Sequence, residues 1–296
     1  MRLVKRLFRR SSRQGDDKAV YNRQMPLKQK PILFPYSRRA LASISRTWIT
    51  FLDVLGEATL NTQEMFRAIA AGRLGIRQFI QQLAFVGVDT LGIALIMTTF
   101  SGMVIALQIA REMVKQGGGD FVGALVSLTI VRELAPIMTS FSVIAMAGSA
   151  YAAELSTMRI TSQVDALDVL HVSPVRYLLI PRVLATTIAL PLMTIITAIA
   201  GILGGLLMSI LFANLEPSRY LDSVWNQTSI KDIFAMLGKS LVFGFVVSLI
   251  ATTIGLKAKG GSLEVGLATT RAVVFSFVIM AILDYVMTYL IYGSHA

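Results

Sequence analysis

The chain has 296 residues, of which 54% are hydrophobic and only 15% are charged, and its formal net charge is +11. A soluble domain usually carries roughly 25% charged residues, so this composition excludes an ordinary soluble protein and indicates a membrane protein. The chain contains no cysteine, which excludes disulfides and thiolate catalysis.

Residues 1–40 form a basic N-terminal tail with twelve Lys or Arg residues against two Asp residues, whereas residues 87–296 hold twelve of each sign. Because the tail leads into apolar segments, we expect it to contact an anionic membrane surface, at about 1 kcal/mol per basic residue. Residues 3–10 alternate apolar and basic positions at helical spacing, which indicates a short helix on the membrane, with an organellar transit peptide as the alternative. Residues 11–40 carry three prolines and are predicted to be a poorly ordered linker.

Residues 41–86 are predicted to form amphipathic helices that lie at the membrane interface. Their apolar positions recur at helical spacing, with charged residues between them and one tryptophan, Trp48. A small soluble helical domain is the alternative, but little apolar surface is available for its core. The apolar positions are Leu41, Ile44, Trp48, Phe51, Leu52, Leu55, Ile76, Phe79, Ile80 and Leu83.

Residues 87–296 are predicted to hold five membrane-spanning helices, because a span needs about 20 apolar residues to cross roughly 30 Å. This makes the fold class an all-α integral membrane protein. The apolar segment 175–212 is too long for one perpendicular helix, so we place 175–183 at the interface and treat Pro181 and Pro191 as kink sites. The predicted spans are 87–110, 121–152, 184–212, 238–256 and 270–292.

Basic loops set the expected orientation. The tail, the 154–182 stretch and the 257–271 turn carry an excess of basic residues, whereas the 111–120 and 213–239 loops are balanced. The positive-inside rule then predicts a cytoplasmic N-terminus and an external C-terminus.

Small residues recur every four positions along the spans, which is typical of close helix packing in lipid. We interpret these stripes as packing seams rather than ligand sites. They are Gly201, Gly205 and Ser209; Gly244, Ser248 and Thr252; and Ala272 and Ser276.

Three charged residues fall inside predicted spans: Arg132, Glu133 and Asp284. A charge at mid-membrane costs about 2.5–3.5 kcal/mol on insertion scales, so such residues usually face a partner or a wet cavity. We expect Arg132 and Glu133 to line a substrate path, with Arg132 paired to Glu133 or to a phosphate, although structural neutralisation is the alternative. For Asp284 we favour a structural hydrogen bond to a neighbouring helix.

The sequence contains no complete signature of an enzyme active site or of a cofactor site. The sequence Gly238-Lys239-Ser240 imitates the end of a phosphate-binding loop, but that pattern needs glycine where Ile233 stands. With two histidines and no cysteine we expect no zinc site, and we expect no other cofactor. The chain is therefore not expected to be an enzyme, and energy for transport must come from another subunit or from an ion gradient.

The stretch 152–182 is the most informative part of the chain. Thr161 or Ser162 can cap a short helix through about Leu170. We expect Val164, Leu167, Val169 and Leu170 to make apolar contacts while Asp165 and Asp168 remain exposed. A short cytoplasmic helix between two spans suits docking into a groove on a partner protein, and a solvated connector is the alternative.

This stretch, with its pattern AAE…MR…Q.DAL…SP.RYL..PR, closely resembles the MlaE/YrbE family of permeases, including plastid relatives. Residues 132–136, 263–271 and 283–285 add to the resemblance, which covers roughly residues 41–296. The family motif RELGP reads RELAP here, with Ala135 in place of glycine.

The resemblance implies a homodimeric permease of an ABC-type phospholipid transporter in the cell inner membrane. It implies a cytoplasmic ABC ATPase, an MCE-domain lipid carrier outside and a small STAS-domain protein as partners. It also implies that the lipid pocket lies at the dimer interface, between the first two spans and the fifth. The residues expected along the substrate path are Arg132, Glu133, Leu107, Gln108 and Arg111. The residues expected to couple to the ATPase are Arg159, Thr161, Gln163, Asp165, Leu167 and Asp168.

Two other functions remain open from the residues alone. An ion-coupled secondary transporter would use Glu133 and Asp284 as proton sites, although no internal repeat supports it. A lipid-modifying membrane enzyme lacks a convincing pair of nucleophile and base.

Overall fold

The structure, a computed structural model, describes residues 35–70 and 75–293, and all regular elements in those ranges are helical. The chain divides into two units, residues 1–49 and 50–296. In the first unit only the beginning of helix α3 (Pro35–Ala70) is described, so the predictions for the tail before residue 35 lie outside the described residues. Residues 35–40 belong to this helix rather than to the predicted linker.

Within residues 35–70 and 75–293, five long apolar helical stretches confirm the predicted number of spans. Two short helices, α9 (Gln163–Val169) and α11 (Pro217–Gln227), lie between them. The first stretch contains α4 (Ile76–Ala84), a wide π-helical turn η1 (Phe85–Asp89) and α5 (Leu91–Lys115). The second contains a 3₁₀ turn η2 (Gly119–Phe121), α6 (Val122–Thr129), a π-helical turn η3 (Ile130–Leu134), α7 (Ala135–Val143), a π-helical turn η4 (Ile144–Gly148) and α8 (Ser149–Ile160). The others are the π-helical turn η5 (Val175–Leu179) with α10 (Ile180–Ala213), then α12 (Ile230–Leu256) and α13 (Ser262–Tyr292).

Each of the five described stretches is longer than the predicted span, and the starts of the first and the third differ most from the prediction. The first stretch begins at Ile76, because α4 packs against α10 and continues into α5 through η1. The third is helical from Val175, and α10 contains Pro191 without a break. Leu179 and Ile180 are buried in a cluster with Val183, so residues 175–183 extend the third helix. How deep these ends lie in the membrane stays a prediction.

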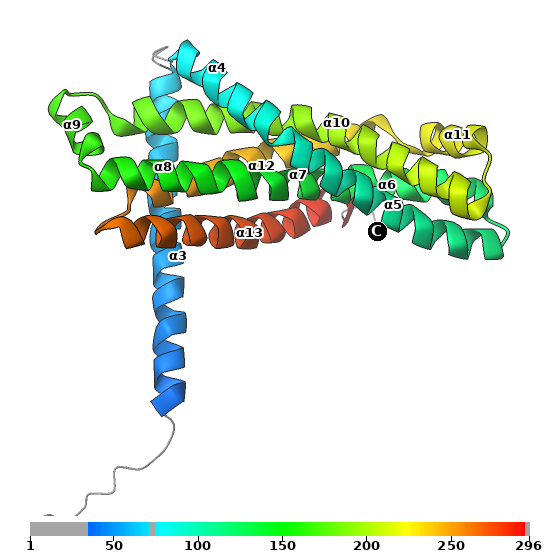
Figure 1. Ribbon diagram of the computed structural model, residues 1–296, viewed down its shortest axis with the longest axis horizontal. Helices are drawn as coiled ribbons and strands as arrows, with labels where there is room; N and C mark the ends of the chain where they lie inside the picture. The colour runs from blue at the N-terminus through cyan, green and yellow to red at the C-terminus, as the bar shows by residue number, and fades with distance from the viewer. Residues whose placement is uncertain (1–34, 71–74, 294–296) are drawn as a thin grey trace, which may run out of the picture. The chain divides into compact units, whose positions relative to one another are not determined.

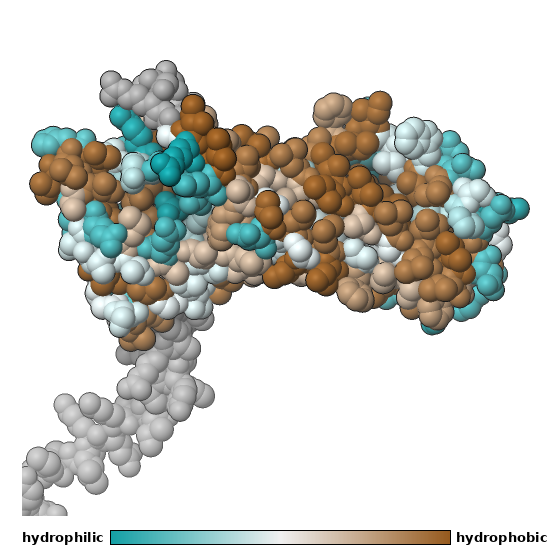
Figure 2. Space-filling view, turned by 45° about the horizontal axis from the view of Figure 1, so that its top comes forward, coloured by the Kyte–Doolittle hydropathy of each residue, from teal (hydrophilic) through white to brown (hydrophobic). Residues whose placement is uncertain are grey.

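In the second unit the long helices lie side by side (Figure 1). Helices α10 and α12 are central, because each packs against several other helices, and α5 packs against α10 while α13 packs against α12. Helix α9 and the 257–261 turn lie at one end of this bundle, which we call the α9 end. Helix α11 and the 116–121 loop lie at the other, which we call the α11 end. Figure 2 shows polar residues gathered mostly at the two ends, with an apolar surface between them. Such a surface is typical of a membrane-spanning bundle.

The small-residue stripes are packing seams, as predicted. Gly201, Gly205 and Gly244 face other helices at close range, and Ser209, Ser248 and Thr252 are fully buried. A Cβ atom on Gly102 would lie 2.3 Å from the backbone oxygen of Gly201. Because lipid tails are as apolar as the side chains, helix association in a membrane depends on such close backbone approach.

Candidate functional site

A cluster of charged side chains lies inside the bundle around Lys239 on α12. Its ammonium group is fully buried and lies 2.8 Å from Glu133 Oε2 and 3.1 Å from Asp284 Oδ1. It also donates to Thr288 Oγ1 at 2.6 Å and to the backbone oxygen of Arg132 at 3.0 Å. An ammonium group has three donors, so Lys239 is fully satisfied.

The structure therefore joins Glu133 and Asp284 through Lys239, which the sequence presents only as part of an incomplete phosphate-loop pattern. Glu133 Oε1 accepts a further hydrogen bond from Thr288 at 2.9 Å. Asp284 on α13 accepts from Lys239 on α12, which confirms the predicted hydrogen bond to a neighbouring helix.

A second group of polar side chains surrounds Arg132, nearer the α11 end. Arg132 Nε donates to Asp232 Oδ1 at 2.8 Å, and its guanidinium lies 4.6 Å from the ring centre of Tyr292. Tyr292 donates to the same carboxylate oxygen at 3.0 Å. The expectation that Arg132 pairs with Glu133 is therefore wrong, because Asp232 and Lys239 supply separate partners. Asp232 is buried and also forms a capping box with Ser229 at the start of α12.

The local backbone explains why Arg132 and Glu133 point at different partners. Both residues lie in the π-helical turn η3, which is followed by Pro136. Proline has no backbone N–H, so Pro136 cannot donate to the carbonyl of Arg132 four residues earlier. Lys239 donates to this carbonyl from α12. Turns of this kind occur frequently at functional sites.

The cluster is only partly closed. The side chains of Arg132 and Glu133 are 38% and 32% exposed, whereas those of Lys239 and Asp232 are 0% and 2% exposed. Two cations and three carboxylates meet here, so the cluster carries a net charge of −1 when all are ionised. It can present a guanidinium and a carboxylate to a charged ligand inside the membrane.

The structure does not join the other predicted path residues to this cluster. Gln108 and Arg111 are exposed and Leu107 is half-buried. All three lie on α5, whose buried side is formed by small residues. Among the described residues, none of these three makes a hydrogen bond or ion pair with Glu133. Their role in the path stays a prediction.

At the α9 end, the predicted coupling segment is a helix, α9, that begins at Gln163. The expected cap is wrong: Ser162 has a left-handed backbone and makes no capping hydrogen bond, and Thr161 donates to Thr157 in the preceding helix. Val164 is buried with Leu155 and Leu178, and Leu167 packs against them.

Against the described part of the chain, the expected apolar contacts of the last two residues in this segment are absent, since Val169 is 77% and Leu170 70% exposed. Asp165 and Asp168 are exposed, as predicted. Helix α9 therefore presents two apolar and two acidic side chains away from the bundle.

Charged residues of the 152–182 stretch pair with one another. Arg159 lies 2.7 Å from Asp165, and the buried Arg182 lies 2.8 Å from Glu154. The second pair joins α8 to α10, the two helices on either side of α9. It therefore helps to hold the connection that contains α9.

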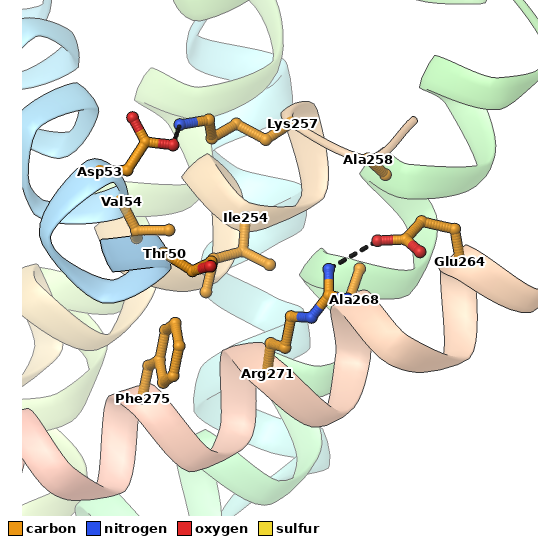
Figure 3. Close-up of a pocket in the computed structure, with 10 residues that line it drawn as sticks. All are labelled: Thr50, Asp53, Val54, Ile254, Lys257, Ala258, Glu264, Ala268, Arg271 and Phe275. Carbon is orange, nitrogen blue, oxygen red and sulfur yellow. Dashed lines mark hydrogen bonds and ion pairs between the residues drawn. The ribbon is translucent and has the colours of Figure 1, made fainter. Parts of the chain in front are cut away.

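A cavity of about 140 Å³ lies at the α9 end between the second half of α3, the end of α12 and α13 (Figure 3). Lys257 reaches Asp53 at 2.7 Å and Glu57 at 2.8 Å, and Arg271 reaches Glu264 at 2.6 Å. Burial lowers the pKa of Lys257, but its hydrogen bonds to Asp53 and Glu57 raise that pKa by more, so it lies above its ordinary value. The two Lys257 pairs hold α3 to the α12–α13 turn, whereas the Arg271 pair lies within α13.

The family model described as Permease MlaE matches residues 79–290. A probable ABC transporter permease protein of Synechocystis is 40% identical over 231 residues, which are 78% of this chain and 88% of the relative. A probable ABC transporter permease protein of Rickettsia felis is 34% identical over 250 residues, which are 84% of this chain and 96% of the relative.

A plant protein is also similar. The Arabidopsis thaliana protein named TRIGALACTOSYLDIACYLGLYCEROL 1, chloroplastic, is 37% identical over 220 residues, which are 74% of this chain and 63% of the relative. The matched range 79–290 contains both the charged cluster and α9.

Proposed function

Since the chain belongs to the MlaE permease family and is an ABC transporter permease subunit, we propose that it moves phospholipid as a homodimer and that Glu133 and Arg132 contact the lipid headgroup. A separate ATPase supplies the energy. The chain itself forms the path through the membrane.

The observation that carries this proposal is the partly exposed charged cluster inside the spans. The described contacts of Arg132 use its Nε, and a guanidinium has five N–H donors, so donors remain for a phosphate. Glu133 is about one-third exposed beside it. A phospholipid headgroup carries a phosphate. The Arabidopsis relative bears the name of a galactolipid, a lipid without phosphate, so its name supports a lipid substrate in general.

A second copy of the chain completes the path. Helix α13 presents an exposed apolar and aromatic side next to Asp284, including Ile282, Tyr285 and Tyr289. Pairing two copies along this side brings two charged clusters together across a symmetry axis.

The ATPase docks at the α9 end. Val169 and Leu170 supply apolar contact there, and Asp165 and Asp168 supply charge. The basic residues of the loops at this end favour its cytoplasmic location, in the inner membrane. The C-terminus then lies outside, where an MCE-domain carrier exchanges lipid, and a STAS-domain protein binds on the ATPase side.

The test compares Glu133→Gln with Glu112→Gln, an exposed glutamate that pairs with Lys115. Each permease is reconstituted with its ATPase, and ATP-dependent movement of a fluorescent phospholipid is measured together with yield, dimer content and copurified lipid. We expect Glu133→Gln to assemble normally and to lose most lipid movement, while Glu112→Gln keeps it.

Two results would contradict the proposal. Full lipid movement by Glu133→Gln would show that the Glu133 carboxylate is not needed to contact the headgroup. Transport that follows a proton gradient without ATP or ATPase would instead support the ion-coupled transporter.

A further inference from the structure

Helix α11 has three distinct sides, although it is only 11 residues long. One side faces the bundle, with Tyr220 buried and Ser223 and Val224 half-buried. A second side carries Arg219, Asp222 and Asn226, all exposed and polar. The third side carries Leu221 and Trp225, one helical turn apart, and Trp225 is 86% exposed.

The bundle holds α11 rigidly in place. Ser223 Oγ accepts from the backbone N–H of Ala124 at 2.7 Å, and Thr228 donates to Ser127 at 3.1 Å. A Cβ atom on Gly123 would lie 2.3 Å from the backbone oxygen of Tyr220. The exposed tryptophan therefore sits on a fixed helix rather than on a loose loop.

These contacts also give the level of α11 along the bundle. Tyr220 lies beside Gly123, and Thr228 lies beside Ser127, so α11 runs in the same direction as α6. Because α6 begins the second span, the end of α11 that carries Trp225 lies beside the first apolar turns of that span (Figure 1).

The exposed apolar surface continues in the next helix. In α12 the side chains of Ile230, Phe234 and Leu241 are 73%, 70% and 51% exposed, and their spacing places them on one face. Helix α12 is the fourth span, so this face meets lipid. Along the chain, the Leu221–Trp225 side of α11 is followed directly by this exposed face of α12.

We propose that the Leu221–Trp225 side of α11 is inserted in the interfacial layer of the membrane at the α11 end. The helix then meets protein on one side, water on the second and lipid on the third. Tryptophan suits this layer because its ring is apolar and its N–H needs a polar partner. The proposal depends on the spans and not on the identity of the substrate.

The experiment uses tryptophan fluorescence, because the chain contains only Trp48 and Trp225. Trp48→Phe leaves Trp225 as the single emitter. The matched control, Trp48→Phe/Trp225→Phe/Asn226→Trp, moves that emitter by one residue to the polar side of the same helix. Both proteins are placed in nanodiscs of phosphatidylcholine, with or without bromine atoms on the acyl carbons near the headgroup, and are titrated with iodide.

We expect brominated lipid to quench Trp225 several-fold more strongly than it quenches the control, and iodide to show the opposite order. Equal iodide quenching in the two proteins, without extra quenching by brominated lipid, would overturn the proposal by placing Trp225 in water. Protection of Trp225 from both quenchers would also overturn it, because protein would then cover this side. Equal unfolding temperatures of the two variants show that both are folded.

Discussion

Replacing Lys239 with methionine should destabilise the permease strongly. The substitution keeps the length of the side chain but removes the only cation that contacts Glu133 and Asp284 among the described residues. It also removes the donor from α12 to the carbonyl of Arg132. Removing one partner of a buried ion pair costs about 3–5 kcal/mol, because the remaining charge stays buried and unpaired.

The charge argument makes a second, sharper prediction. In Lys239→Met/Glu133→Gln/Asp284→Asn the whole group around position 239 is neutral. Replacing a buried ion pair by neutral groups of similar volume is often tolerated, so this triple variant should recover most of the lost stability. It should still move no lipid if Glu133 contacts the headgroup.

The assay is thermal unfolding in one detergent, followed by size-exclusion chromatography. A loss of about 3–5 kcal/mol corresponds to a fall of roughly 10 °C, at about 2–4 °C per kcal/mol for a chain of this order of size. The control is Lys231→Met, which removes an exposed lysine from the same helix. The reasoning is refuted if Lys239→Met unfolds at the same temperature as Lys231→Met, or if the triple variant is less stable than Lys239→Met.

Two further substitutions test the α9 end and the seat of α11. Asp165→Lys/Asp168→Lys should weaken ATPase binding in a pull-down. It should change the free energy of unfolding by less than about 1 kcal/mol, because the pair of Asp165 with Arg159 is exposed. The control is Asp120→Lys/Asp222→Lys at the α11 end, and equal ATPase binding by both variants would mean that α9 is only a connector. Gly123→Ala should cost about 1–3 kcal/mol through overpacking against Tyr220, measured as a fall in unfolding temperature, whereas Gly238→Ala meets no atom within 4 Å and should cost little.

The spans could be predicted from the sequence because each is a local property. A run of apolar residues is visible without knowing its neighbours, and the small-residue stripes show where other helices approach. The span ends were less certain. Pro191 lies inside α10, which is helical on both sides of this residue and packs against α5 and α12, so a kink there stays a prediction.

The partners of the charged residues could not be predicted, because they come from distant parts of the chain. Arg132 pairs with Asp232 and Glu133 with Lys239, each about 100 residues away in sequence. The sequence predicts a fourth span from 238 to 256, with Lys239 at its edge. The fourth span in fact begins at Ile230, which places Lys239 well inside it, and an isolated lysine within an apolar helix was the available signal.

The contact between Lys239 and the carbonyl of Arg132 has a consequence for biogenesis. The two residues are 107 positions apart, so at about 5–20 residues per second the ribosome needs roughly 5–20 s to go from one to the other. During that interval the second span lacks the ammonium group that contacts the Arg132 carbonyl and Glu133 in the structure. A polar group in lipid without a partner costs several kcal/mol, so we expect water or another temporary partner beside Glu133 until then. These contacts of the second span form only after the fourth span has been made.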